Sequence, residues 1–255
     1  MRLTTHRNAV IAFAAIAGLT MAARTAEAQL PKLSQFHPSL YGSTELDTRN
    51  SQFYLLGLYV GVGGLGWSPY FNVNAYSLHY RLVRDAPASA RTLSAASPTL
   101  GMAYAGRNNG VSLGGGYTWV QHPDPGAPGA EGGGDNGASA SLGAYHNGAG
   151  RRPFHTQLLA NYNFGSQYAW ARGRASIPFG YSNKHPARIG VEVVGQGGGK
   201  DPLKSNTFQA GPTLEYTWTP QFRTTGAVGY KSVGGQRFAS RESAPYLKLE
   251  FSFSP

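Results

Sequence analysis

Apolar and polar residues alternate along several segments of about ten residues. In VSLGGGYTW (111–119) the large apolar side chains fall on one set of alternate positions, and serine, glycine and threonine fall on the other. Residues 154–164, 208–218 and 246–253 alternate in a similar way. Because successive side chains of a β-strand point to opposite faces, this period of two predicts strands with one apolar face. No segment shows the apolar spacing of an amphipathic helix, so the pattern predicts an all-β protein.

The first 28 residues have the features of a secretory signal peptide. Arg2 and Arg7 form a charged start, residues 9–23 form an apolar run, and Ala26-Glu27-Ala28 forms a small-residue cleavage site. The apolar run is shorter than the roughly 20 residues that span a bilayer as a helix, so we expect cleavage rather than a membrane anchor. Removing residues 1–28 takes away three Arg and one Glu, which lowers the formal net charge from +10 to +8.

Composition separates the two all-β architectures that fit an exported chain. A soluble sandwich buries its apolar strand faces between two sheets, whereas a membrane barrel turns them toward lipid and turns its polar faces toward the lumen. The chain has 35 glycines, 12% aromatic and only 13% charged residues, and it has no cysteine with which to form a disulfide. Aromatic pairs fall near strand ends, where the interfacial girdles of membrane barrels lie. These pairs are Tyr117 and Trp119, Tyr162 and Phe164, Tyr216 and Trp218, and Phe251 and Phe253.

From about residue 38 to Phe253 the chain therefore resembles bacterial outer-membrane β-barrel proteins. The resemblance implies a signal peptide at 1–28, a periplasmic lead at 29–37 and one antiparallel transmembrane barrel at 38–255 in the bacterial outer membrane. It also implies outer-membrane lipids and the barrel-assembly machinery as partners, and no nucleic acid. One departure is the end of the chain, because such proteins commonly finish on an aromatic residue, whereas Ser254 and Pro255 follow Phe253 here.

The turns between predicted strands give a strand count. If the last strand runs toward the periplasm, the long connections fall on the outer side, and the short turns 106–110 and 219–221 fall on the periplasmic side. The strand at Gln52 then descends, so a rising strand must precede it, and residues 38–46 supply one. The sequence thus predicts about twelve strands, with ten as the alternative if two short segments fuse. The other strands start near Gln52, Tyr70, Thr92, Val111, Ala138, Phe154, Tyr168, Arg188, Thr207, Phe222 and Tyr246.

The segment GVGGLG (61–66) matches the G-x-G-x-x-G pattern of dinucleotide sites, and Asp85 follows at roughly the expected distance of about 20 residues. Such a site needs a helix after the glycines, because the helix N-terminus supplies the amide donors for the phosphates. Pro69 and a run of aromatic and β-branched residues follow instead. We therefore expect Gly63, Gly64 and Gly66 to supply positive φ in a turn between two strands.

Other candidate chemistry is sparse, and we predict no catalytic residue, metal or cofactor. Ser112 lies in a match to G-x-S-x-G, but that motif needs a strand-turn-helix, and the alternation puts Ser112 inside a strand facing the lumen. The acidic loop at 122–137 lacks the order of a calcium loop. The histidines of the exported chain lack zinc-ligand spacing. The only candidate residues for a hydrolase active site are His79, Asp85, Ser89 and Ser94, and they match no recognised motif.

The polar strand faces carry charges that would lie in the lumen. Basic residues exceed acidic ones on these faces, and Arg172 and Arg174 are the strongest candidates for contact with small anionic solutes. Structural pairing of these arginines with the lumen glutamates is an equal alternative. The inferred lumen charges are Arg81, Arg172, Arg174, Arg223, Lys231 and Lys248 against Glu192, Glu215 and Glu250.

Three function classes follow from a barrel with such a lumen. A small passive channel or solute-binding barrel with a mildly basic lumen fits the charges and the lack of a catalytic constellation. A structural or secretion-accessory barrel with a closed lumen is the first alternative. An outer-membrane lipid-modifying enzyme is the second, and it requires a reactive set of residues that the sequence does not supply.

Overall fold

The computed structural model describes residues 36–49, 51–82, 89–121, 136–148, 154–179, 187–199, 205–235 and 242–255. The expected signal peptide and nearly all of the expected periplasmic lead lie outside these ranges, as does most of the acidic loop at 122–137. Residues 37–255 form one unit. Within the described ranges, no helix has the length and apolar character needed to cross a membrane.

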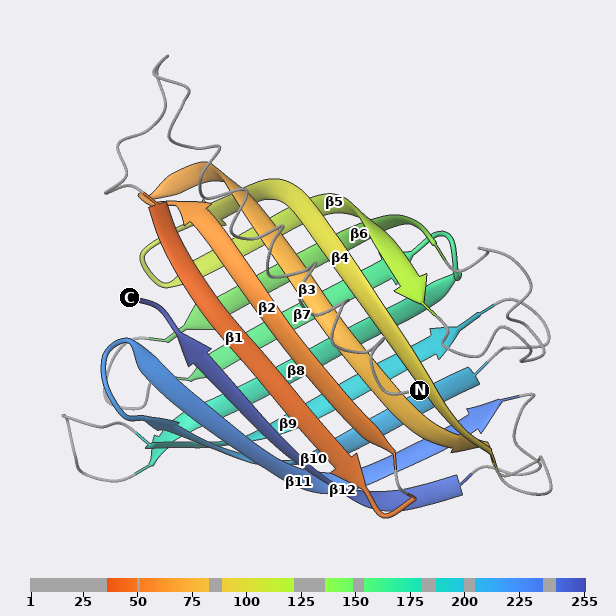
Figure 1. Ribbon diagram of the computed structural model, residues 1–255. Coiled ribbons are helices and arrows are strands. Elements are labelled where there is room, and N and C mark those ends of the chain that lie inside the picture. Colours follow the sequence, from red (N-terminus) through yellow and green to blue (C-terminus); the bar gives the residue numbers. More distant parts are fainter. Residues whose placement is uncertain are drawn as a thin grey trace. The chain divides into compact units, whose positions relative to one another are not determined.

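Twelve antiparallel strands form a closed barrel, each beside its neighbours in the sequence (Figure 1). The prediction of about twelve strands is therefore confirmed, and several strands extend a few residues beyond the predicted starts. The strands are β1 (Phe36–Asp47), β2 (Gln52–Val62), β3 (Gly66–Leu82), β4 (Ser89–Ala105), β5 (Asn109–Gln121), β6 (Gly137–Asn147), β7 (His155–Asn163), β8 (Tyr168–Phe179), β9 (Ala187–Gly198), β10 (Ser205–Thr217), β11 (Phe222–Gly235) and β12 (Glu242–Phe253).

The barrel closes where the first strand pairs with the last. β1 and β12 are antiparallel and in register from Leu40 opposite Phe253 to Asp47 opposite Tyr246. Figure 1 shows the two strands side by side although they stand at opposite ends of the sequence. Closure leaves no unpaired sheet edge, which a bilayer core requires because lipid cannot hydrogen-bond a free backbone group.

The two ends of the barrel differ in what they carry. The start of β1, the end of β12 and the turns after β2, β4 and β10 all lie at one end, which we call the periplasmic end because the sequence predicts short periplasmic turns there. The end of β5 at Gln121 and the start of β6 at Gly137 lie at the opposite end, which we call the outer end. The turns after β2, β4 and β10 agree with the sequence-based scheme, but the short turns at 48–51 and 164–167 lie at the outer end.

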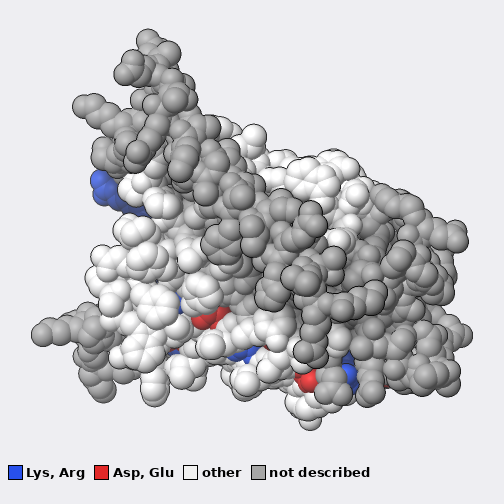
Figure 2. All heavy atoms as spheres, viewed as in Figure 1, with Lys and Arg blue, Asp and Glu red and all other residues white. Residues whose placement is uncertain are grey.

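The outward face of the barrel is apolar. Leu158 on β7, Leu214 on β10 and Leu249 on β12 are each about half exposed on this face. Figure 2 shows few charged atoms among the described residues on one side of the molecule. Outward aromatic residues gather near both ends of the strands, as predicted for interfacial girdles. They include Tyr117 with Trp119 and Tyr162 with Phe164 toward the outer end, and Trp67 with Tyr104 and Tyr216 with Trp218 toward the periplasmic end.

The inward face combines small residues with aromatic rings that lie against the wall. A Cβ added to Gly57 would fall on the ring of Tyr41, whose hydroxyl lies 2.8 Å from Oδ1 of Asn72 and 2.6 Å from Oδ1 of Asn74. Tyr70 stacks on Tyr59 with ring centroids 5.3 Å apart. Glycine in these strands therefore lets a neighbouring ring pack close to the backbone.

The glycine-rich turn between β2 and β3 corrects one expectation. Gly64 and Gly66 have the predicted positive φ, at 131° and 101°. Gly63 does not have a positive φ. Its small size serves packing instead, because a Cβ at this position would overlap the imidazole of His37. The segment after Gly66 is strand β3 and not a helix, so the geometry of a dinucleotide site is absent from this turn.

Candidate functional site

Paired charges line one side of the lumen, from β8 through β12 to β1. The alternation of each strand directs these side chains inward, opposite to the apolar residues on the same strand. They form three groups along the barrel axis. The outer cluster is Glu45, Asp47, Arg49, Lys231 and Glu242; the central cluster is Arg172, Arg174, Glu192, Lys248 and Glu250; the periplasmic cluster is Arg188, Glu215 and Arg223.

In the central cluster, two carboxylates are held by three cations. Glu250 lies 2.6 Å from Nη1 of Arg172 and 2.6 Å from Nη2 of Arg174, and its Oε1 lies 3.3 Å from Nζ of Lys248. Glu192 pairs with Arg174 and with Lys248. The side chain of Glu192 is fully buried. A charge buried in this way is tolerated only because several opposite charges and hydrogen bonds satisfy it.

The central cluster joins strands that are not neighbours. Arg172 and Arg174 belong to β8 and Glu192 to β9, whereas Lys248 and Glu250 belong to β12. β10 and β11 separate β9 from β12 in the barrel wall. The ion pairs that reach β12 therefore run across part of the lumen as a chord, whereas Arg174 and Glu192 pair between the neighbouring strands β8 and β9. Arg172 also donates to Oε1 of Gln157 at 2.9 Å, which adds β7 as a fourth strand to β8, β9 and β12.

The outer cluster lies at the seam between the ends of the chain. Lys231 on β11 donates to Oε1 of Glu45 at 2.8 Å and lies 3.5 Å from Oδ2 of Asp47. Gln209 on β10 donates to the other carboxylate oxygen of Glu45 at 3.0 Å. Asp47 also accepts from the backbone N–H groups of Arg49 and Ser51, which shapes the turn between β1 and β2.

The periplasmic cluster has fewer charged groups than the other two clusters, and its two arginines have a single carboxylate as partner. Arg188 on β9 donates to Oε1 of Glu215 on β10 at 2.9 Å. Arg223 on β11 lies 3.6 Å from the same oxygen, beyond normal hydrogen-bond length, and about half of its side chain is exposed (49%). Two guanidinium groups thus share one carboxylate oxygen.

Small residues line the opposite side of the lumen, on β4, β5 and β6. Ser97 on β4 and Thr118 on β5 hydrogen-bond at 3.0 Å. The ring of Tyr70 extends over this wall, with its hydroxyl 3.5 Å from Oγ of Ser141. The inward positions are mostly serine, threonine and glycine: Ser97, Thr99, Gly101, Ser112, Gly114, Gly116, Thr118, Ser139, Ser141 and Gly143.

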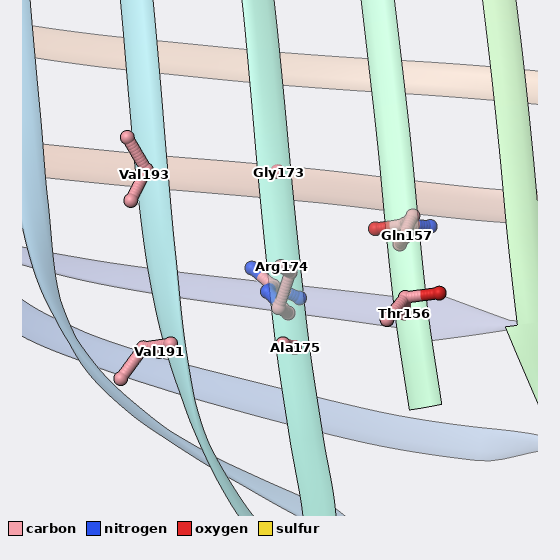
Figure 3. A pocket seen from close by; sticks show the side chains of 7 residues that line it. All are labelled: Thr156, Gln157, Gly173, Arg174, Ala175, Val191 and Val193. Atoms are coloured by element: carbon pink, nitrogen blue, oxygen red, sulfur yellow. The ribbon is translucent and has the colours of Figure 1, made fainter. Parts of the chain in front are cut away.

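A surface hollow of about 330 Å³ lies at the central part of β7, β8 and β9 (Figure 3). Figure 3 shows its lining residues on these three neighbouring strands: Thr156, Gln157, Gly173, Arg174, Ala175, Val191 and Val193. Val191 and Val193 are outward-facing and exposed, and a Cβ added to Gly173 would meet no atom within 4 Å. The hollow is therefore an apolar depression where the wall of the barrel carries small residues.

The structure brings most of the predicted lumen residues into ion pairs. Arg172, Arg174 and Lys248 meet in the central cluster, Lys231 lies in the outer cluster and Arg223 in the periplasmic cluster. Arg81 lies in β3, and its side chain is outside the described part of the structure. The prediction missed Glu45, Asp47 and Arg188, although alternation within their strands puts all three on the inward face.

The remaining candidates for chemistry do not meet in a site. Ser112 lies inside β5 on the inward face, as predicted, and not on a strand-turn-helix elbow. His79 on β3 makes a 3.0 Å hydrogen bond with Thr92 on β4. Asp85 and the side chain of Ser89 lie outside the described residues. Over the described ranges, no group of three or more His, Cys, Asp or Glu residues could hold a metal ion.

A closed sheet with an apolar outer face, aromatic residues at both ends and a polar, charged interior defines a transmembrane β-barrel of the bacterial outer-membrane type. No family model and no curated protein sequence matches the chain. Several solved structures resemble it at low sequence identity, and these likenesses concern the fold alone.

Three of these structures illustrate the likeness. The beta domain of the Bordetella autotransporter BrkA is 11% identical, with a TM-score of 0.49 over 87% of this chain and 100% of that one. LpxR from Salmonella typhimurium is 12% identical, with a TM-score of 0.46 over 84% and 99%. The KdgM porin is 10% identical, with a TM-score of 0.44 over 85% and 99%. Function must therefore be argued from the residues of this chain.

Proposed function

We propose that the protein is a narrow passive channel of the outer membrane for small polar solutes, with its constriction at the central cluster. The observation that carries the proposal is the chord of ion pairs from Arg172 and Arg174 on β8 to Glu250 on β12. Long charged side chains that extend into the lumen narrow the path and determine which ions and solutes can pass.

The opposite wall supports a path beside this constriction. β5 lies opposite β11 in the order of the twelve strands, and its inward residues are serine, glycine and threonine. A barrel of this size is wider than the eight-stranded barrels that side chains fill and narrower than open porins. The proposal therefore assigns the path to the space between the charged chord and the small-residue wall.

Charge balance supports weak selectivity. The central cluster has one more cation than carboxylates, the periplasmic cluster also has one more, and the outer cluster has one fewer. These described groups sum to a single positive charge, much less than the basic excess inferred from the sequence. We expect a slight preference for small anions over cations.

The outward leucines and aromatic residues support contact with outer-membrane lipid, and we propose that the barrel-assembly machinery inserts the chain. The proposal includes no catalytic step. A second candidate function is a closed structural or secretion-accessory barrel. It is favoured by the complete pairing of Glu192, whose buried carboxylate contacts Arg174 and Lys248.

Single-channel recording in planar bilayers tests the channel. We expect the wild type to conduct in small steps with a reversal potential shifted slightly toward anions. The double variant Arg172→Ala with Glu250→Ala removes one cation and one anion from the chord, so the net charge stays the same while the constriction widens. Its conductance should rise by about twofold or more.

The matched control is Arg223→Ala with Glu215→Ala, which removes an oppositely charged pair from the periplasmic end, where Arg223 is half exposed. Its conductance should change much less. A wild type and a central double variant that both fold without conducting would reject the channel. A closed wild type whose central double variant conducts would favour the closed barrel.

A further inference from the structure

The periplasmic cluster contains more donors than its one carboxylate can accept. Arg188 directs Nη1 at Glu215, but its Nε is buried and has no hydrogen-bond partner among the described residues. Arg223 reaches Glu215 only at 3.6 Å and keeps half of its side chain exposed. A buried N–H group without a partner is costly, so a ligand that supplies an acceptor would be favoured there.

A histidine lies at the same end of the lumen, because His155 is the first residue of β7 and β7 begins at the periplasmic end. The charges of Arg188, Glu215 and Arg223 act on its imidazole. Its Nδ1 lies 2.9 Å from Oδ1 of Asn147, and its Nε2 is buried without a partner. Three strands, β7, β9 and β11, therefore contribute polar nitrogen atoms at this end of the lumen, and β10 contributes the carboxylate of Glu215.

We propose that this cluster is a binding site for a small oxyanion, a phosphate or a carboxylate, at the periplasmic end of the lumen. Guanidinium groups are planar and present several N–H donors that match the oxygen spacing of carboxylate and phosphate. Arg223 and the free Nε of Arg188 are the binding groups, and Glu215 holds the two guanidinium groups near each other. The role of the site, which is to hold an anionic solute at the periplasmic opening of the lumen, rests on the proposed channel function. The binding itself does not depend on that function.

A buried Nε without a partner also occurs at Arg49 in the outer cluster and at Arg172 in the central cluster, so charge balance and exposure distinguish the three clusters. In the outer cluster, three carboxylates face two cations, so an anion would be repelled. In the central cluster, both carboxylates contact more than one cation, and no side chain is more than 14% exposed. The periplasmic cluster alone, among the clusters formed by the described residues, combines excess positive charge with an exposed guanidinium group.

Isothermal titration of the full exported protein in detergent tests the site. Inorganic phosphate and acetate are titrated separately at constant ionic strength, because bulk screening alone changes surface electrostatics. We expect saturable binding of at least one of the two anions, and the comparison identifies whether phosphate or carboxylate fits better. Arg223→Gln should weaken that binding roughly tenfold or more, since a charge-assisted hydrogen bond is lost.

Arg49→Gln is the matched control, because it makes the same substitution in the outer cluster. It should leave anion affinity unchanged, and the gel mobility of unheated samples shows that each variant is folded. An Arg223→Gln protein that binds like the wild type, or a wild type that binds neither anion, overturns the inference. If the wild type conducts but does not bind, only this site is rejected; if it binds but does not conduct, only the channel is rejected.

Discussion

Glu192 is the largest side chain buried to less than 2% exposure among the described residues. The cations around its carboxylate stabilise this buried negative charge. Removing one partner of a buried ion pair leaves the other charges uncompensated. We expect Glu192→Gln to lower the free energy of unfolding by about 3–5 kcal/mol, because Arg174 and Lys248 lose a shared carboxylate. Urea titration of the protein in detergent or lipid vesicles, followed by gel mobility without heating, measures this change.

Arg223→Gln is the comparison at a half-exposed pair, for which the expected cost is about 1 kcal/mol or less. The double variant Glu192→Leu with Lys248→Met removes a cation together with the carboxylate and should recover part of the loss. Equal costs for Glu192→Gln and Arg223→Gln would contradict a structural role of the buried cluster.

Alternation along single strands was enough to predict which way these side chains point, but not which ones meet. Arg172 and Arg174 were predicted to face inward because they alternate with alanine and glycine in YAWARGRAS. Their contact with Glu250, 76 to 78 residues later, depends on how the barrel curves across the lumen. Glu45 could have been found by the same alternation, yet its partner Lys231 belongs to a strand at the far end of the sequence.

At the scale of strands, the sequence predicted the number and order of elements because each strand has its own apolar face and turn signals. Boundaries were less certain, since hydrogen bonding continues past the alternating core of a strand. β3 begins at Gly66, whereas the pattern suggested a start near Tyr70, and β12 begins at Glu242, four residues before Tyr246. Polar residues at these ends pair by backbone groups that hydrophobic alternation does not detect.

The outward faces of β10 and β12 give a test of the assigned orientation. Leu214 and Leu249 both lie opposite Gly226 of β11, so they occupy one row on the apolar surface. Leu214→Arg and Leu249→Arg should each lower the free energy of unfolding by roughly 2–4 kcal/mol in lipid vesicles, because a charge then faces the hydrocarbon region. Leu214→Phe and Leu249→Phe are the controls and should change stability little. Tolerance of arginine at both positions would show that this face does not contact lipid.

At the scale of the whole molecule, pairing of β1 with β12 closes the barrel, so inward side chains from both ends of the sequence face the same lumen. Glu45 of the outer cluster stands opposite Lys248 of the central cluster in the pairing of β1 with β12. The charged side of the lumen is therefore complete only after the last strand has paired with the first. Contacts of such sequence separation form late and slowly in folding, which neither alternation nor turn signals could indicate.

Paired cysteines across the seam test closure directly, because the natural chain has no cysteine. Thr44 lies opposite Leu249 in the β1–β12 register. Opposite residues of antiparallel strands have Cα atoms about 4.5–5.5 Å apart, within the range that a disulfide bridges. Thr44→Cys with Leu249→Cys should form a disulfide on export and shift the denatured, non-reduced chain on a gel. Thr44→Cys with Leu214→Cys, two strands from β12, should remain reduced. A folded protein without the first cross-link would contradict the closed barrel.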